Sequence, residues 1–375
     1  MSITVCLSAN TIGYPTGGGH FWVYLNWALG LRALGCRVIW LEAVKANWHQ
    51  QKVKSNILHL RSRLERYGLA GCLAIYSGSE GTLPPEVQEQ CLTLDVATEA
   101  DLLLNMRYGM RQEVVDRFRR SVLLDIDPGL LQFWMSAGQV GIARYDLYFT
   151  IGETVGEQNA RVSGAGIKWQ YTPPCVALNW WPPRRAAADA PLTTVAHWYG
   201  GIMEFDGKSF ANAKRDAFAP YLELPSRTEF PLELALDMSS DDEDQVKLWA
   251  NGWRVRDSAS VASTSWDYQR YIQDSRGEFS CAKPSCIHFQ NAWISDRTLC
   301  YLASGKPAVV EHTGPSRFLP DAEGLLRFRS FEEAVRCLKT VANDYERQCK
   351  RARSLAEEYF DARKVAGKLL ERSLP

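Results

Sequence analysis

Strand-like runs that are apolar at every position alternate with helix-like segments along this chain, and this alternation restricts the fold more than any other feature. The first run is Ile3–Leu7, and Arg37–Leu41 follows after an amphipathic segment from Phe21 to Leu34. Uniformly apolar strands separated by helices are typical of a parallel sheet that helices cover on both faces. Gly35 is expected to end the first helix in the left-handed conformation. Further strands of this series are predicted at 72–76, 101–105, 122–126, 147–151 and 168–171.

The alternation stops in a proline-rich stretch, residues 171–191, and then starts again. Closely spaced prolines favour a stiff extended connector. Beyond it, a helix is predicted over 208–218, and strands are predicted at 193–198, 231–237, 253–257, 278–282, 307–311 and 325–328. The sequence therefore predicts two doubly wound α/β domains. We expect an N-terminal domain over 1–175, a hinge over 176–191, and a C-terminal domain over 192–375 that includes the terminal helices.

Composition excludes several classes of protein. The 375 residues include 43 basic and 43 acidic side chains, and this zero balance argues against nucleic-acid binding, which favours a basic excess. No apolar stretch reaches the roughly 18 residues of a membrane span, and the N-terminus does not resemble a signal peptide. The ten cysteines contain no CxxC pair. We expect a soluble, reduced, cytoplasmic protein without a metal site.

A glycine loop follows the first predicted strand and ends in Gly17-Gly18-Gly19-His20. Ligands of open α/β sheets bind at the carboxyl ends of strands, and consecutive glycines there let the backbone approach a ligand closely. We therefore predict that Gly17, Gly18 and Gly19 contribute to substrate binding. His20 opens the next helix and is a candidate general base for an acceptor hydroxyl. Alternatively, His20 caps the turn or orders the loop.

Two carboxylates, Asp125 and Asp127, end another apolar strand, just before Pro128. Residues two apart on a strand share a face, so both side chains would meet one ligand if the strand continued to Asp127. Asp127 is the second candidate for the base. A helix cap is the alternative role for either residue.

The second predicted domain contains a denser set of candidates. Ser295 or Asp296 is placed to start a helix whose positive end faces the ligand, and Lys283 and Arg297 offer donors for a diphosphate. Thr313-Gly314 follows the next predicted strand, again at a carboxyl end. Surface ion pairing is the alternative for Arg297.

Aromatic side chains are abundant. We single out Trp198, because it lies at a predicted strand end and Gly200 and Gly201 follow it closely. An indole at that place could stack on a sugar or a base, whereas core packing is the alternative. The acidic run at 241–244 fits the first turn of a helix better than a metal site.

The stretch from Ser295 to Gly324 resembles the C-terminal half of GT-B glycosyltransferases. The resemblance rests on a helix, the sequence Gly305-Lys306-Pro307-Ala308-Val309, a strand and then Thr313-Gly314, and on Phe331-Glu332-Glu333-Ala334 further on. It implies two Rossmann-like domains with a cleft between them. It also implies a nucleotide-diphosphate sugar, bound mainly by the second domain, as co-substrate. No other cofactor and no metal are implied. Lys283 and Arg297 would then neutralise the departing diphosphate, and Thr313 and Gly314 would lie near phosphate or sugar.

The chain departs from the retaining members of that superfamily. Their two glutamates would fall at Ala292 and Cys300, and Lys208, Lys214 and Arg215 match their Arg-x-x-x-x-Lys pair only loosely. An inverting mechanism with a true general base is therefore favoured, with His20 preferred to Asp127 because histidine is largely neutral at pH 7. The alternatives are a catalytically silent sugar-nucleotide-binding module and an NAD(P)-dependent oxidoreductase. The chain lacks the GxGxxG motif after its first strand that an NAD(P)-dependent oxidoreductase is expected to have.

Overall fold

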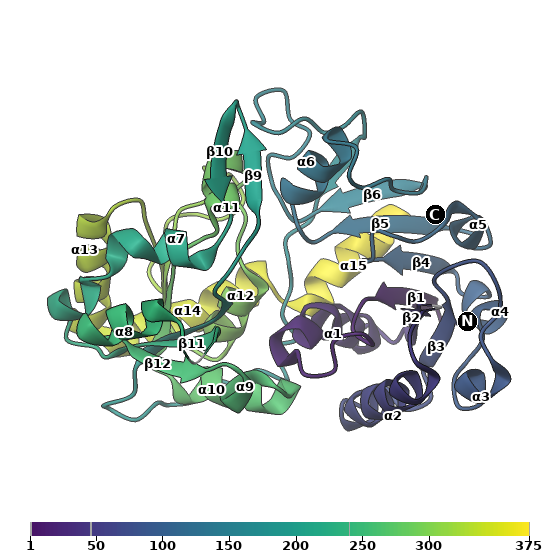
Figure 1. The fold of residues 1–375 in the computed structure, drawn as a ribbon, viewed down its shortest axis with the longest axis horizontal. Coiled ribbons are helices and arrows are strands. Elements are labelled where there is room, and N and C mark those ends of the chain that lie inside the picture. Colours follow the sequence, from purple (N-terminus) through teal and green to yellow (C-terminus); the bar gives the residue numbers. More distant parts are fainter. Residues whose placement is uncertain (1, 46, 240, 375) are drawn as a thin grey trace. The chain divides into compact units, whose positions relative to one another are not determined.

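The structure is a computed structural model that describes residues 2–45, 47–239 and 241–374. It divides into two compact units (Figure 1). Unit 1 comprises Met1–Gln158, Val162–Ala177 and Ala362–Pro375, and unit 2 comprises Asn159–Arg161 and Leu178–Asp361. Each unit is built on its own parallel sheet, which confirms the predicted α/β class.

Unit 1 contains a seven-stranded sheet in the order β3-β2-β1-β4-β5-β6-β7, with all neighbours parallel. The strands are β1 (Thr4–Ala9), β2 (Arg37–Val44), β3 (Leu73–Ser77), β4 (Leu102–Asn105), β5 (Ser121–Asp125), β6 (Leu147–Thr150) and β7 (Trp169–Tyr171). The strand order reverses between β1 and β4, where Cys6 of β1 pairs with both Ile39 and Leu103. Such a reversal is the usual ligand-binding point of a doubly wound sheet.

The helices of unit 1 are α1 (Gly18–Ala33), α2 (Gln50–Arg66), α3 (Pro85–Gln88), α4 (Leu94–Thr98), α5 (Gln112–Val115), α6 (Leu130–Ser136) and α15 (Ala362–Ser373). Gly35 follows α1 with φ +83° and its N–H donates to the Arg32 carbonyl, so the predicted helix end is confirmed. Helix α1 packs closely on α15, as Figure 1 shows. A Cβ at Gly30 would lie 2.5 Å from the Ala362 carbonyl oxygen, so the two backbones are nearly in contact there.

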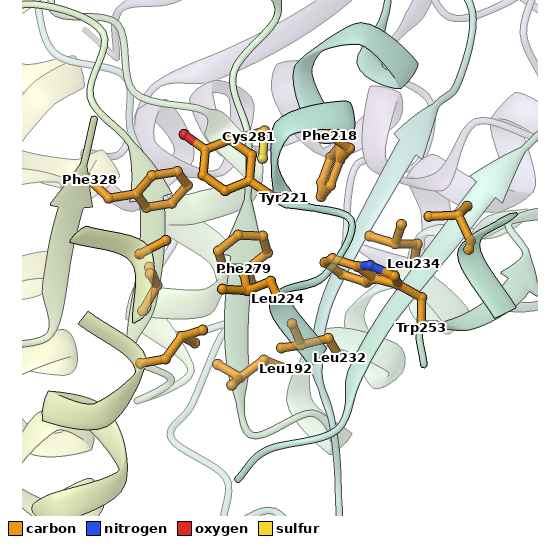
Figure 2. Close-up of a cluster of buried hydrophobic side chains, with 14 of the residues drawn as sticks. Leu192, Phe218, Tyr221, Leu224, Leu232, Leu234, Trp253, Phe279, Cys281 and Phe328 are labelled. Carbon is orange, nitrogen blue, oxygen red and sulfur yellow. The ribbon is translucent and has the colours of Figure 1, made fainter. Parts of the chain in front are cut away.

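Unit 2 repeats the topology with six parallel strands in the order β12-β11-β8-β13-β14-β15. They are β8 (Leu192–His197), β11 (Leu232–Asp237), β12 (Arg254–Asp257), β13 (Gly277–Ser280), β14 (Ala308–Glu311) and β15 (Leu325–Phe328). The order reverses between β8 and β13. Figure 2 shows the core on one face of this sheet, where the rings of Phe279 and Phe328 stack with centroids 5.4 Å apart.

The helices of unit 2 are α7 (Lys214–Phe218), α8 (Glu243–Ala250), α9 (Ala259–Ala262), α10 (Ser265–Asp274), α11 (Pro284–Phe289), α12 (Asp296–Ala303), α13 (Phe331–Asn343) and α14 (Tyr345–Tyr359). Two 3₁₀ turns, Ala219–Tyr221 and Leu224–Arg227, complete it.

The predicted helix over 208–218 is wrong in its first half. An antiparallel hairpin of β9 (Ile202–Phe205) and β10 (Lys208–Ala211) lies there, and only Lys214–Phe218 is helical. The hairpin turn is Asp206-Gly207, with φ values of +51° and +68°. Two residues with positive φ form the tight turn that matches strand twist, and Asp-Gly is a typical sequence for it.

The predicted domain limits need two corrections. Helix α15 belongs to unit 1, because it packs on α1, so unit 2 ends at Asp361. The expected hinge is also largely part of unit 2. Trp181 is fully buried and its carbonyl accepts from Arg353 of α14 at 2.9 Å, while the Pro182 carbonyl accepts from Gln273 of α10. The proline-rich segment from Leu178 to Pro191 is therefore packed on unit 2. The part of unit 1 that precedes this segment ends at Ala177.

Within the described part of the chain, no helix combines the length and apolar character needed to cross a membrane. All ten cysteines are free thiols.

Candidate functional site

The carboxyl ends of β13 and β14 in unit 2 enclose a cavity against the start of α12, which we call the carboxyl-edge cavity. Three predicted donor-binding residues, Ser295, Arg297 and Thr313, line it. Lys214 and Glu311 line it as well. Parallel α/β sheets bind ligands at this edge, so the cavity lies where a donor site is expected.

Ser295 and Asp296 begin α12 as predicted. The Ser295 hydroxyl accepts the backbone N–H of Arg297 at 3.3 Å, and Asp296 is the first helical residue. The amino end of α12 therefore lies beside the cavity, where the positive end of the helix dipole favours an anion.

Arg297 is held by the protein through all three guanidinium nitrogens. Nε donates to Glu278 at 2.7 Å, Nη1 donates to the Val195 carbonyl at 2.9 Å, and Nη2 donates to the Ser280 hydroxyl at 2.6 Å. Glu278 is fully buried and the Arg297 side chain is 14% exposed. These bonds fix the start of α12 to β8 and β13 across the switch point. Arg297 thus joins α12 to two strands of the sheet, and its contact with a diphosphate stays a prediction.

Lys214 and Glu311 bring two titratable groups into the cavity. Lys214 is 7% exposed, and its Nζ donates to the Cys281 carbonyl. Burial, reinforced by the positive charge of Arg297, lowers the pKa of Lys214 to about 8. Burial raises the pKa of Glu311 to about 7, although the Ala282 N–H at 2.9 Å and the charge of Lys214 oppose the rise. Both groups therefore change charge near neutral pH.

Thr313 and Gly314 join the loop after β14 to the segment before α12. The Thr313 hydroxyl donates to the Trp293 carbonyl at 2.5 Å, and its own carbonyl accepts from Ala292 at 3.0 Å. A Cβ at Gly314 would lie 2.4 Å from the Gln290 carbonyl oxygen, and Gly314 has φ +126°. Ala292 itself has φ +58°, which is uncommon for alanine. The cavity wall is therefore a tightly determined loop, although Ala292 brings no carboxylate to it.

The other predicted donor residues of unit 2 do not line the cavity: Asp296, Gly314 and Lys283 adjoin residues that do, whereas Trp198 lies elsewhere. Lys283 is the N-cap of α11 and is half-buried, close enough to Lys214 for its charge to lower that pKa. Trp198 is 3% exposed, belongs to the hydrophobic core and donates its indole N–H to Asp244 at 3.0 Å. The prediction that Trp198 stacks on a ligand is therefore corrected, because packing has buried the ring.

In unit 1, hydrogen bonds from neighbouring elements tie down the glycine loop. Gly18 and Gly19 already lie in the first turn of α1, and Gly17 is its N-cap. Glu42 is a buried residue of β2, and its carboxylate accepts the Thr11 N–H at 2.9 Å. Burial raises the pKa of Glu42, although the hydrogen bonds from Thr11 and Trp40 oppose the rise. Arg63 of α2 donates to the Pro15 carbonyl at 2.9 Å. The loop is thus held on two sides by buried charged groups.

His20 extends from the first turn of α1, between the rings of Tyr14 and Tyr24, with centroids 5.6 and 5.3 Å away. Its Nε2 lies 2.8 Å from the Asn10 carbonyl oxygen, which can only accept, so Nε2 carries a hydrogen. In the neutral ring, Nδ1 then holds the basic lone pair. His20 therefore orders the loop through Nε2, which is the alternative role, while a role as base through Nδ1 stays a prediction.

Asp125 and Asp127 meet at the hydroxyl of Tyr108, which lies 3.2 and 3.0 Å from them. Asp125 is fully buried, accepts from Gln132 and Thr150 at 2.8 Å each, and burial raises its pKa to about 6. Its role is structural. Asp127 is half-buried and lies beyond the end of β5, and Gly129 is the N-cap of α6. Strand β4 lies between β1 and β5, so Asp127 and His20 follow strands that are two places apart in the sheet.

Sequence reasoning missed several residues that shape these sites. Glu311 was not singled out, although a carboxylate ends a buried strand there, and Lys214 was only a loose candidate. Tyr108, Glu42 and Arg63 were also missed. Polar residues at or just after apolar strands would have pointed to Glu42, Tyr108 and Glu311, whereas nothing in the sequence ties Arg63 to the loop. In the described residues, no group of three histidine, cysteine or carboxylate side chains is placed to hold a metal.

Comparison with known proteins gives matches among solved structures only. No family model and no curated protein matches the chain. Sucrose-phosphate synthase from Thermosynechococcus elongatus matches with 12% identity and a TM-score of 0.57, over 99% of this chain and 98% of that one. An alpha-glucosyltransferase in complex with UDP matches with 10% identity and a TM-score of 0.63, over 99% of each chain. Anabaena HepE in complex with UDP-glucose matches with 13% identity and a TM-score of 0.57, over 99% of each chain. The chain has the GT-B fold of these glycosyltransferases along its full length.

Proposed function

We propose that the protein is a glycosyltransferase that moves a sugar from a nucleoside-diphosphate sugar to a hydroxyl acceptor. The observation that carries the proposal is the carboxyl-edge cavity, which combines a helix N-terminus with the buried Lys214 in a chain of GT-B fold. Two of the matched structures are complexes with UDP and with UDP-glucose, and this supports the donor class.

The donor diphosphate is assigned to the carboxyl edge of unit 2. Lys214 in its charged form, the nearby Lys283 and the positive end of the α12 dipole supply the positive potential that stabilises a departing diphosphate. Glu311 opposes that potential only when it is ionised, so its raised pKa favours the donor below about pH 7. Thr313 borders the same cavity from the loop after β14, and Gly314 is the next residue of that loop.

The base is assigned to His20 of unit 1. Nδ1 would accept the proton of the acceptor hydroxyl as the acceptor oxygen bonds to the anomeric carbon and the bond to the diphosphate breaks. Such general-base catalysis contributes about 100- to 10,000-fold. A displacement of this kind inverts the anomeric configuration, and the non-acidic residues Ala292 and Cys300 support it over a retaining route. Asp127 is the second choice, because Tyr108 already occupies one of its oxygens.

We propose that no cofactor beyond the nucleotide sugar is needed. Lys214 and Lys283 supply charge of the kind that a divalent cation contributes in metal-assisted transfer. Transferase activity is therefore expected to persist in the presence of a chelator such as EDTA. If EDTA abolished the activity and Mg²⁺ or Mn²⁺ restored it, this part of the proposal would be contradicted.

A two-step experiment tests the function. Thermal shift measurements over nucleoside diphosphates and their sugar conjugates find the donor, because ligands that bind the folded state raise its stability. Release of the nucleoside diphosphate, with and without acceptor mixtures, is then measured, and the anomeric configuration of the product is read by NMR. Binding without any turnover would support the silent module instead. Stabilisation by NAD(P) alone would support the oxidoreductase.

A further inference from the structure

A second cavity lies at the opposite edge of the unit 2 sheet, near the amino ends of β8 and β12. Its volume is about 340 Å³, and we call it the amino-end pocket. Pro191 and Thr193 border it at the start of β8, Arg254 at the start of β12, and Arg270 and Tyr271 from α10. Parallel strands place this edge at the far end of the sheet from the carboxyl-edge cavity. The pocket is therefore separate from the donor site.

The carboxylates that line the amino-end pocket already have partners. Glu233 accepts from Arg256 at 3.1 and 3.2 Å, and from the Tyr271 hydroxyl at 2.8 Å. Asp274 pairs with Arg184 at 2.9 Å, and Asp267 accepts from the Thr264 hydroxyl at 2.5 Å. Their negative charges are thus offset by protein groups or engaged in hydrogen bonds.

The arginines are not balanced in the same way. Arg254 and Arg270 are exposed, and neither has a hydrogen bond or an ion pair to another described residue. Arg256 is oriented by Glu233 and stays half-exposed, so it forms a third guanidinium at the same wall. Two guanidinium groups without an acceptor beside one cavity make a site that attracts an anion.

We propose that the amino-end pocket binds a small phosphorylated molecule of sugar-phosphate size. A phosphomonoester carries a charge of about −1.5 to −2 and three acceptor oxygens, which match Arg254 and Arg270 better than a single carboxylate does. Pro191, Val261 and the ring of Tyr271 offer an apolar wall for the carbon skeleton. The volume falls within the usual range for small-molecule sites, roughly 300–1,000 Å³.

Calorimetric titration with ribose 5-phosphate tests the proposal on the full chain without any donor. We compare the wild type, the double variant Arg254→Gln/Arg270→Gln and the control Arg336→Gln, which removes another exposed arginine, on α13. Saturable binding is expected in the wild type and the control. The double variant should bind about 100-fold more weakly, because each charge-assisted contact contributes roughly tenfold. Ribose, which lacks the phosphate, should not bind.

Three results would overturn the proposal: no saturable binding in the wild type, equal affinity in the double variant, or citrate binding as tightly as the phosphate ester. A second measurement needs no variant. Phenylglyoxal modifies exposed arginines, and ribose 5-phosphate should protect Arg254 and Arg270 while leaving Arg336 reactive, as read by mass spectrometry. Modification of all three at unchanged rates would also refute the site. Neither measurement depends on the glycosyltransferase proposal.

Discussion

Replacing Arg297 by methionine separates its structural role from a ligand-binding role. Methionine keeps much of the length of the side chain but removes the bonds to Glu278, Val195 and Ser280, at 2.7, 2.9 and 2.6 Å. The consequence is largest at Glu278, because this carboxylate is fully buried and loses the charge that balances it.

The size of the effect follows from that burial. Removing one partner of a buried ion pair costs about 3–5 kcal/mol, since the remaining charge is left without compensation. Surface pairs contribute about 0–1 kcal/mol, so the control Arg336→Met should change the free energy of unfolding little. Adding Glu278→Gln to Arg297→Met removes the unbalanced charge, and this double variant should recover part of the loss.

The urea midpoint of unfolding at pH 7 is measured for Arg297→Met, for the double variant and for the Arg336→Met control. Donor affinity of the same variants is measured by calorimetry. We expect a clearly lower midpoint for Arg297→Met, a partial return in the double variant, and weaker donor binding because the start of α12 is released. A midpoint equal to that of the Arg336→Met control, together with donor affinity reduced about tenfold, would refute the structural role. That outcome would support direct diphosphate binding instead.

Further predictions concern the titratable groups and the helix packing. Donor affinity should fall as pH rises from 6 to 9, because Glu311 gains negative charge near pH 7 and Lys214 loses positive charge near pH 8. Glu311→Gln should remove the step near pH 7, and calorimetry showing the same affinity across this range would contradict the assignment. His20→Ala should lower turnover about 100-fold or more with donor affinity nearly unchanged, and full turnover, or a product that keeps the donor's anomeric configuration, would rule out this base. Gly30→Ala should destabilise unit 1 by about 1–3 kcal/mol, because its Cβ would lie 2.5 Å from Ala362. Gly367→Ala on α15 is the matched control in thermal unfolding, since its Cβ would meet only Leu34 at an ordinary 3.7 Å.

The sheet strands were predictable because buried parallel strands are apolar at every position. The first strand, the helix end at Gly35 and the second strand series all appear close to where the sequence predicts them. The hairpin at 202–211 was missed because its strands are short and half-exposed and carry no apolar run, although Asp206-Gly207 was a readable turn signal. The position of α15 was not predictable. Its amphipathic pattern specifies a buried face but not which unit covers that face.

Some residues of the candidate sites were likewise predictable from the sequence, and others were not. Thr313 follows the end of β14 and Ser295 caps the start of α12, and both were picked out because topology alone places strand ends and helix starts at one edge of the sheet. Trp198 was misassigned because a strand-end position does not tell whether the side chain points to the edge or into the core. Lys214 and Glu311 required the structure, since only packing brings α7 beside β14 and shifts both pKa values toward neutrality.

The glycine loop shows why a base at this place benefits from buried charges elsewhere. A histidine acts as a general base only if its lone pair stays oriented, and the bond from His20 to the Asn10 carbonyl sets that orientation. Asn10 is followed at once by Thr11, which Glu42 holds, and the loop ends at Gly17, whose carbonyl lies 3.4 Å from Arg63. Arg63 is only 2% exposed, and burial lowers its pKa to about 10, so keeping it charged there carries a cost in stability. That cost is understandable if the loop must hold His20 in place for the proton transfer proposed above.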